Sequence, residues 1–145
     1  MRPKSIVNFE RVVLLSILAR IVSDWINWDK TQAVMAQAQA QAGRVMFGAN
    51  FAIGVQVVMI LVFLLLLWLI ARKGSPIAKW IYVVFVLIGL VAGIVGLRQT
   101  IAWGPLPLAV AVLEYLLSLF SLWLLFQPDS KAWFGEGRGP DPEGF

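Results

Sequence analysis

The sequence contains no cysteine and no histidine among its 145 residues. Their absence excludes disulfides, thiolate nucleophiles, Ser-His-Asp triads and nearly all zinc and haem ligand sets. Charged residues are also scarce, at 14% of the chain. Carboxylates, arginine, lysine, tyrosine and amides are the groups left for function. We therefore expect no catalytic residues, no metal and no cofactor, and a protein that is not an enzyme.

Hydrophobic residues, in contrast, make up 60% of the chain, and the mean hydropathy is +0.82. A soluble domain is about half apolar, so the surplus has to be covered by lipid. The chain contains four apolar segments, and each has about the 20 residues that a helix needs to cross a hydrocarbon layer of about 30 Å. The sequence predicts an all-α membrane protein, a four-transmembrane-helix bundle in a single domain over residues 1–128, with helices at about 9–28, 51–71, 76–97 and 105–126.

Two stretches lie outside the predicted spans. The connection 29–50 is longer than the roughly 2–8 residues usual in a helical hairpin. Two alternatives are equally open for this partly helical loop: a helix that begins near Asp29 or Thr31 and ends at Gly43, as its alanines and glutamines allow, or a polar loop. Residues 129–145 are predicted to be a short interfacial turn and a disordered cytoplasmic tail.

The orientation follows from the basic turn between the second and third segments, which contains Arg72, Lys73 and Lys79. If this turn is cytoplasmic, both termini are too. Three basic residues then lie outside, and eight lie inside: Arg2, Lys4, Arg11, Arg72, Lys73, Lys79, Lys131 and Arg138. We predict that Arg72, Lys73, Lys79 and Trp80 anchor the chain to the lipid surface. Because the charges lie at segment ends and form no patch, we expect no nucleic-acid partner.

Three ionisable residues fall at hydrocarbon depth, where a charge is costly: Arg20, Asp24 and Glu114. The helical rise places them in one layer, with Gln56 slightly outward of it. Arg20 and Asp24, four residues apart, share a helix face. Three interpretations remain open: a proton- or cation-handling site, an ion pair that fixes helix register, or an interfacial Asp24 with Glu114 at a subunit contact.

Two further patterns concern helix ends and packing. Gly89, Gly93 and Gly96 lie on nearly one face of the third segment and predict close helix contact, within the chain or between copies. At the amino terminus, Ser5 or Asn8 is expected to cap the first helix.

Three stretches resemble a family of small four-span inner-membrane proteins of proteobacteria. They are residues 2–11 (RPKSIVNFER), 70–81 (IARKGSPIAKWI) and 124–134 (LLFQPDSKAWF). The resemblance implies a bacterial inner membrane and four spans, and it implies no activity, since that family has none assigned. Arg20 departs from the family pattern, which has a small residue there.

The function expected from the residues is that of a non-enzymatic membrane subunit, which packs against copies of itself or a larger membrane complex within the lipid bilayer. The alternative is an oligomeric channel or a proton- or cation-coupled carrier that uses Glu114 with Arg20 and Asp24. The subunit would use the face of Gly89, Gly93 and Gly96 and the layer of Glu114, whereas the carrier would use the layer of Glu114.

Overall fold

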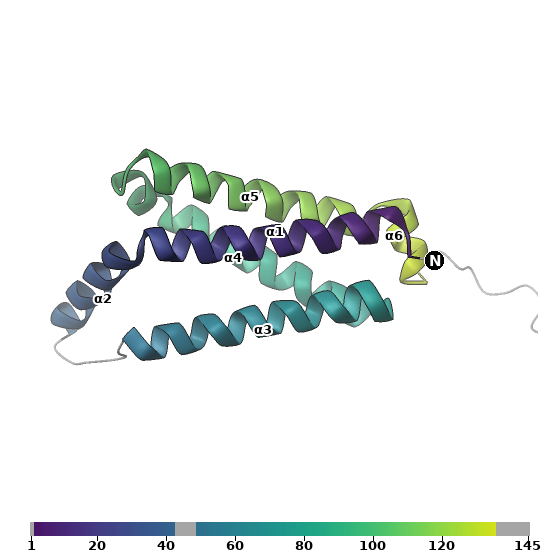
Figure 1. Ribbon diagram of the computed structural model, residues 1–145, viewed down its shortest axis with the longest axis horizontal. Helices are drawn as coiled ribbons and strands as arrows, with labels where there is room; N and C mark the ends of the chain where they lie inside the picture. The colour runs from purple at the N-terminus through teal and green to yellow at the C-terminus, as the bar shows by residue number, and fades with distance from the viewer. Residues whose placement is uncertain (1, 43–48, 136–145) are drawn as a thin grey trace, which may run out of the picture.

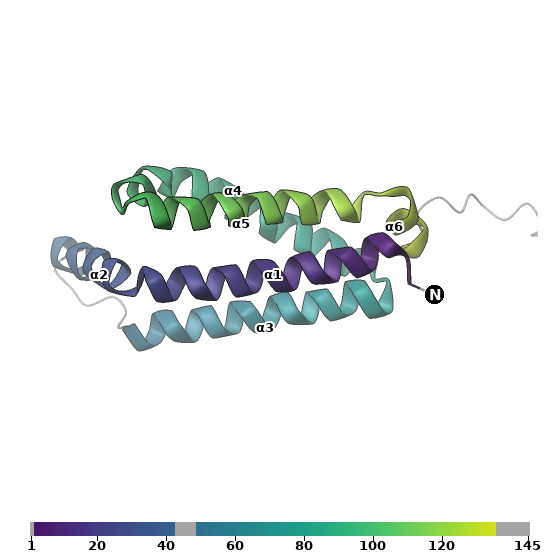
Figure 2. The ribbon, with the colours of Figure 1, turned by 45° about the horizontal axis from the view of Figure 1, so that its top comes forward.

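The structure, a computed structural model, describes residues 2–42 and 49–135, and every regular element in these residues is a helix (Figure 1). The helices are α1 (Lys4–Ile26), α2 (Trp28–Ala42), α3 (Ala49–Lys73), α4 (Pro76–Ala102), α5 (Pro105–Leu125) and α6 (Pro128–Trp133). The four long helices α1, α3, α4 and α5 lie alongside one another in alternating directions (Figures 1 and 2). Each contacts two others, in the order α1, α3, α4, α5 and back to α1.

Three of the long helices have the length and composition of membrane spans: Ile53–Lys73, Pro76–Ala102 and Pro105–Leu125. Their outward side chains are large and apolar, as for Leu61 and Val91, which suits contact with lipid. The prediction of an all-α membrane protein is confirmed to this extent. Helix α1 is comparable in length, but it carries four charged residues beyond its first turn: Glu10, Arg11, Arg20 and Asp24.

The described part of the connection between α1 and α3 is helical, which is one of the two alternatives that its alanines and glutamines left open. Helix α2 follows α1 after the buried Asn27, whose side-chain amide donates to the Ser23 carbonyl at 2.9 Å. The Nζ of Lys30 donates to the Trp103 carbonyl at 2.6 Å and ties α2 to the end of α4. The predicted helix end at Gly43 and the tail after residue 135 lie outside the described residues.

Almost all buried side chains lie at one end of the bundle, which holds the amino terminus and the α3–α4 turn (Figure 1). We call this the closed end. The rings of Phe9 and Phe63 pack edge-on against Tyr82, with centroids 5.2 and 5.8 Å away. The Tyr82 hydroxyl lies 2.8 Å from that of Ser121. The apolar core comprises Ile6, Phe9, Val13, Leu66, Leu67, Ile70, Ala71, Ala78, Tyr82, Val83, Val86, Leu124, Leu125 and Phe134.

Helix α6 folds back onto the start of α1. The hydroxyl of Ser130, fully buried, donates to the Leu124 carbonyl at 2.6 Å and lies 2.7 Å from the Ser5 hydroxyl. A carboxylate oxygen of Asp129 accepts from the Ser5 backbone N–H at 3.3 Å. The expected cap is therefore wrong: Pro3 occupies the cap position without a side-chain bond, and Asp129 satisfies the N–H that a local cap would have bound.

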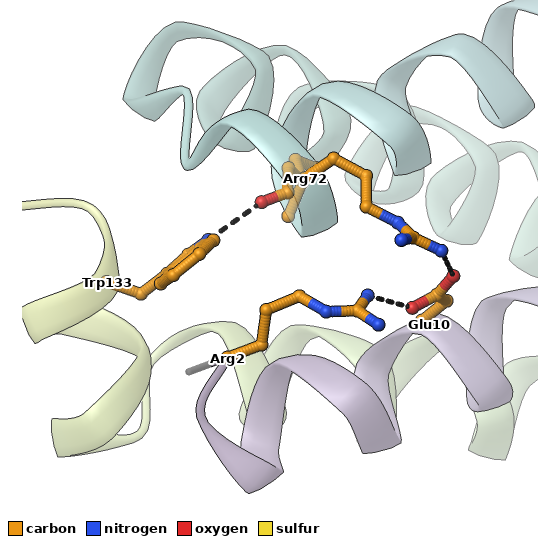
Figure 3. A network of polar contacts seen from close by, with 5 residues as sticks. Arg2, Glu10, Arg72 and Trp133 are labelled. Carbon is orange, nitrogen blue, oxygen red and sulfur yellow. Dashed lines mark hydrogen bonds and ion pairs between the residues drawn. The ribbon is translucent and has the colours of Figure 1, made fainter.

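Helix α6 also contacts the end of α3. The indole N–H of Trp133 donates to the Ile70 carbonyl at 3.0 Å (Figure 3). Gly74 ends α3 with a φ of 61°, a left-handed conformation that glycine adopts without strain. A Cβ at Gly74 would lie 3.0 Å from the Trp133 carbonyl oxygen, so both backbone conformation and packing require glycine here.

Lys79 lies inside the protein, although it was expected at the lipid surface with Arg72, Lys73 and Trp80, which are exposed. Its side chain is fully buried, and its ammonium lies 4.8 Å from the Phe126 ring centroid and 4.9 Å from that of Phe134. Aromatic faces attract a cation, so Lys79 stabilises the contact of α5 and α6 with the start of α4.

Gly74→Ala should lower the free energy of unfolding by about 1–2 kcal/mol, because alanine is strained at this φ and its methyl group approaches Trp133. Thermal unfolding in detergent measures the change. Gly96→Ala is the control, because Gly96 lies within a helix and has nothing within 4 Å of an added Cβ. Equal stability of both variants and the wild type would refute the role of Gly74.

The bond to Ser5 predicts a pH dependence at the closed end. Hydrogen bonds from the Ser5 side chain and backbone lower the pKa of Asp129, which lies outside the spans. Asp129 therefore stabilises the fold above the ordinary aspartate pKa of about 3.9, and this contribution is lost as the pH falls below that value.

Asp129→Asn should consequently lower the melting temperature by a few degrees at pH 7, and the difference from wild type should shrink near pH 3. Thermal unfolding in detergent at both pH values measures it. Asp29→Asn, which changes an exposed aspartate of α2, is the control. A difference between Asp129→Asn and wild type that does not change with pH would contradict the assignment.

Candidate functional site

The side of α1 that faces the core changes character along the helix. Ile6, Phe9 and Val13 are fully buried at the closed end. Arg20 and Asp24 continue the same stripe, since seven residues bring a helix back to nearly the same face. The interior side of α1 is thus apolar in its first half and charged in its second.

The same change occurs on α3 and α5. On α5, Glu114 lies seven residues from the buried Ser121 and shares its face. On α3, Gln56 lies seven residues before Phe63, which packs against the core. The three stripes place four polar side chains at one level of the bundle.

The structure brings these four side chains into contact, and we call them the polar layer. Arg20 Nε lies 3.4 Å from Asp24 Oδ2, and Arg20 Nη1 lies 3.9 Å from Glu114 Oε2. The amide nitrogen of Gln56 donates to Asp24 Oδ2. Arg20 therefore lies between two carboxylates from α1 and α5, and Gln56 connects α3 to them. With both carboxylates ionised, the layer has a net charge of −1.

The polar layer is only partly covered. The side chains of Arg20 and Asp24 are 58% and 41% exposed, whereas that of Glu114 is 18% exposed. The Oε1 atom of Glu114 is buried and accepts no hydrogen bond from the described residues. The helices pack closely at the closed end but do not close over the layer, so we call this part of the bundle the open half.

Gly93 lies beside the polar layer, where α4 meets α5. A Cβ built on Gly93 would lie 2.2 Å from the Tyr115 hydroxyl oxygen and 2.6 Å from its ring, so the tyrosine occupies the space that a side chain at Gly93 would need. Gly89 and Gly96 have nothing within 4 Å of an added Cβ. Of the three predicted packing glycines, Gly93 contacts another helix of the same chain, and the other two face outward.

Sequence reasoning missed several contacts that hold the helices of the bundle together. Asp129, Ser130 and the ring of Trp133 join α6 to the ends of α1 and α3, although α6 was predicted to be only an interfacial turn. The pairing of Tyr115 with Gly93 was also missed. A large aromatic residue at the depth of a small-residue helix face is the signal that could have indicated it.

Comparison of the chain with protein-family models, curated proteins and solved structures finds no match.

Gly93→Ala should destabilise the protein by about 1–3 kcal/mol, because the added methyl group forces Tyr115 out of its place. Gly89→Ala is the matched control on the same helix and should be neutral. In the background of Tyr115→Ala the effect of Gly93→Ala should disappear, and thermal unfolding of the four proteins measures this coupling. Additive effects would show that Gly93 and Tyr115 are not in contact.

Proposed function

We propose that the protein is a small, non-enzymatic membrane subunit that crosses the membrane four times and associates with copies of itself or with a larger membrane complex. In this proposal α1 crosses the membrane as well as α3, α4 and α5, which makes four spans. Both termini are cytoplasmic, and the membrane is the bacterial inner membrane that the resemblance of the sequence implies. The three apolar helices support the membrane location.

One observation carries the subunit proposal: Arg20 and Asp24 lie on the core-facing stripe of α1, yet they are 58% and 41% exposed. A charged group in hydrocarbon costs about 2.5–3.5 kcal/mol or more, so lipid is an unfavourable cover for the polar layer. A segment of another membrane protein, or of a second copy, supplies a better cover because its polar groups pair with the charges.

The glycine face of α4 supports the same proposal. Gly89 and Gly96 leave the α4 backbone open to close approach from outside the chain, because nothing within it lies near them. Small residues of this kind are the usual contact points between membrane helices, since lipid provides no hydrophobic drive for their association. Gly93 is unavailable for this contact because Tyr115 covers it.

A second candidate function is an oligomeric channel or a proton- or cation-coupled carrier. It is favoured by the Glu114 carboxylate, whose buried Oε1 has no hydrogen-bond donor among the described residues and is free to bind a proton or cation. Arg20, which lies near both carboxylates, would compete with that ion for Glu114.

Native mass spectrometry of the chain, extracted gently from its own membrane, should show a defined species heavier than one copy. Gly89→Leu should reduce this species, because the new side chain blocks close approach to α4. Gly54→Leu is the matched control on α3, since an added Cβ there also meets nothing within 4 Å. A wild-type protein that is monomeric throughout would refute the subunit proposal.

The carrier alternative is tested by flux into proteoliposomes. Wild type should then transport protons or a small cation, and Glu114→Gln should abolish the flux because the amide cannot ionise. Gln56→Glu, added to Glu114→Gln, returns a carboxylate to the polar layer. Recovery of flux in this double variant would show that Glu114→Gln lost flux through loss of charge and not through misfolding. Equal, negligible flux in wild type and Glu114→Gln would exclude the carrier.

A further inference from the structure

Two arginines from different parts of the chain converge on Glu10 at the closed end (Figure 3). Arg2, which precedes α1, places Nη1 2.6 Å from Glu10 Oε2. Arg72, in the last turn of α3, places Nη2 3.6 Å from Glu10 Oε1. One carboxylate therefore holds two guanidinium groups, and each group contacts a different oxygen.

The pair retains unused positive charge and hydrogen-bonding capacity. Two arginines and one carboxylate sum to +1, and the exposed side chains of Lys4, Arg11 and Lys73 follow close by in the sequence. The side chains of Arg2 and Arg72 are 31% and 54% exposed, so their remaining N–H donors are accessible. Such donors bind the oxygens of phosphate in a fixed, forked geometry.

The position of the arginines along α3 indicates where the phosphate comes from. The apolar span Ile53–Lys73 ends within one residue of Arg72, and the exposed indole of Trp68 lies one turn earlier, under the ammonium of Lys73 at 5.4 Å. Tryptophan and terminal basic residues of a span lie at the level of the lipid headgroups. Arg72 therefore lies at the depth of the phosphates of the adjacent leaflet.

We propose that Arg2 and Arg72, positioned by Glu10, form a binding site for one phosphate group, which an anionic phospholipid supplies from the adjacent leaflet. The phosphate oxygens accept hydrogen bonds from both guanidinium groups on the side away from Glu10. The site joins the segment before α1 to the end of α3 through the lipid.

Glu10 distinguishes this site from general attraction between a basic surface and an anionic membrane. General attraction grows with net positive charge, so removal of the Glu10 charge should strengthen it. A site that depends on the placement of two guanidinium groups should instead become weaker, because Glu10 holds them in position. The two explanations predict opposite signs for Glu10→Gln.

The experiment is native mass spectrometry of the full chain in detergent, titrated with phosphatidylglycerol and, separately, with phosphatidylcholine and inorganic phosphate. Wild type should retain one phosphatidylglycerol in preference to phosphatidylcholine. Arg72→Gln and Glu10→Gln should each lower this affinity by about tenfold, the loss expected for a hydrogen bond to a charged group. Arg11→Gln removes the same charge as Arg72→Gln from an exposed position and should change the affinity little.

Inorganic phosphate that competes with phosphatidylglycerol, and whose binding is lost in Arg72→Gln, would support the phosphate site. If inorganic phosphate does not compete, the site binds the phosphate only as part of the lipid. Arg72→Lys keeps the positive charge but lacks the forked N–H donors of the guanidinium group, so it should also bind phosphatidylglycerol more weakly. Tighter binding by Glu10→Gln, or equal losses in Arg72→Gln and Arg11→Gln, would overturn the proposal in favour of general electrostatics.

Discussion

The contact on which the rest of the structure depends is that of α6 with the start of α1. Lipid offers no hydrophobic drive to bring helices together, so packing and hydrogen bonds between the helices have to stabilise their association. Ser130, fully buried, bonds to Leu124 and lies against Ser5, and Asp129 satisfies an N–H of the first turn of α1. These bonds fix α1 against the end of α5, and the apolar core assembles at the same end.

Because the bonds and the buried rings are concentrated at the closed end, the other half of the bundle has less to hold it together. There the core-facing stripes carry Arg20, Gln56 and Glu114 in place of aromatic residues. The charged side chains of Arg20 and Asp24 stay partly exposed there, since burial of an ion pair without further hydrogen-bond partners can cost more than its attraction returns. The looser packing of the open half thus goes together with the polar side chains in its interior.

Much of the helical architecture could be predicted from the sequence because it depends on local composition. The long apolar runs of α3, α4 and α5 are confirmed within a few residues, whereas the alanine and glutamine content left α2 open between a helix and a polar loop. The one-layer arrangement of Arg20, Asp24 and Glu114 followed from the helical rise and the expected ends and directions of the two spans. A rise of 1.5 Å per residue is a property of the backbone and needs no knowledge of tertiary contacts.

What the sequence could not indicate depends on contacts between distant residues. Lys79 looks like a surface cation in a basic turn, but the rings of Phe126 and Phe134, brought there by α5 and α6, favour its burial. Likewise Ser5 and Asn8 match the local rule for a cap, but Asp129, more than a hundred residues away, takes that role. Both differences involve the short helix α6, which packs against the bundle. A local rule describes a helix end in water, and it fails where another part of the chain replaces that water.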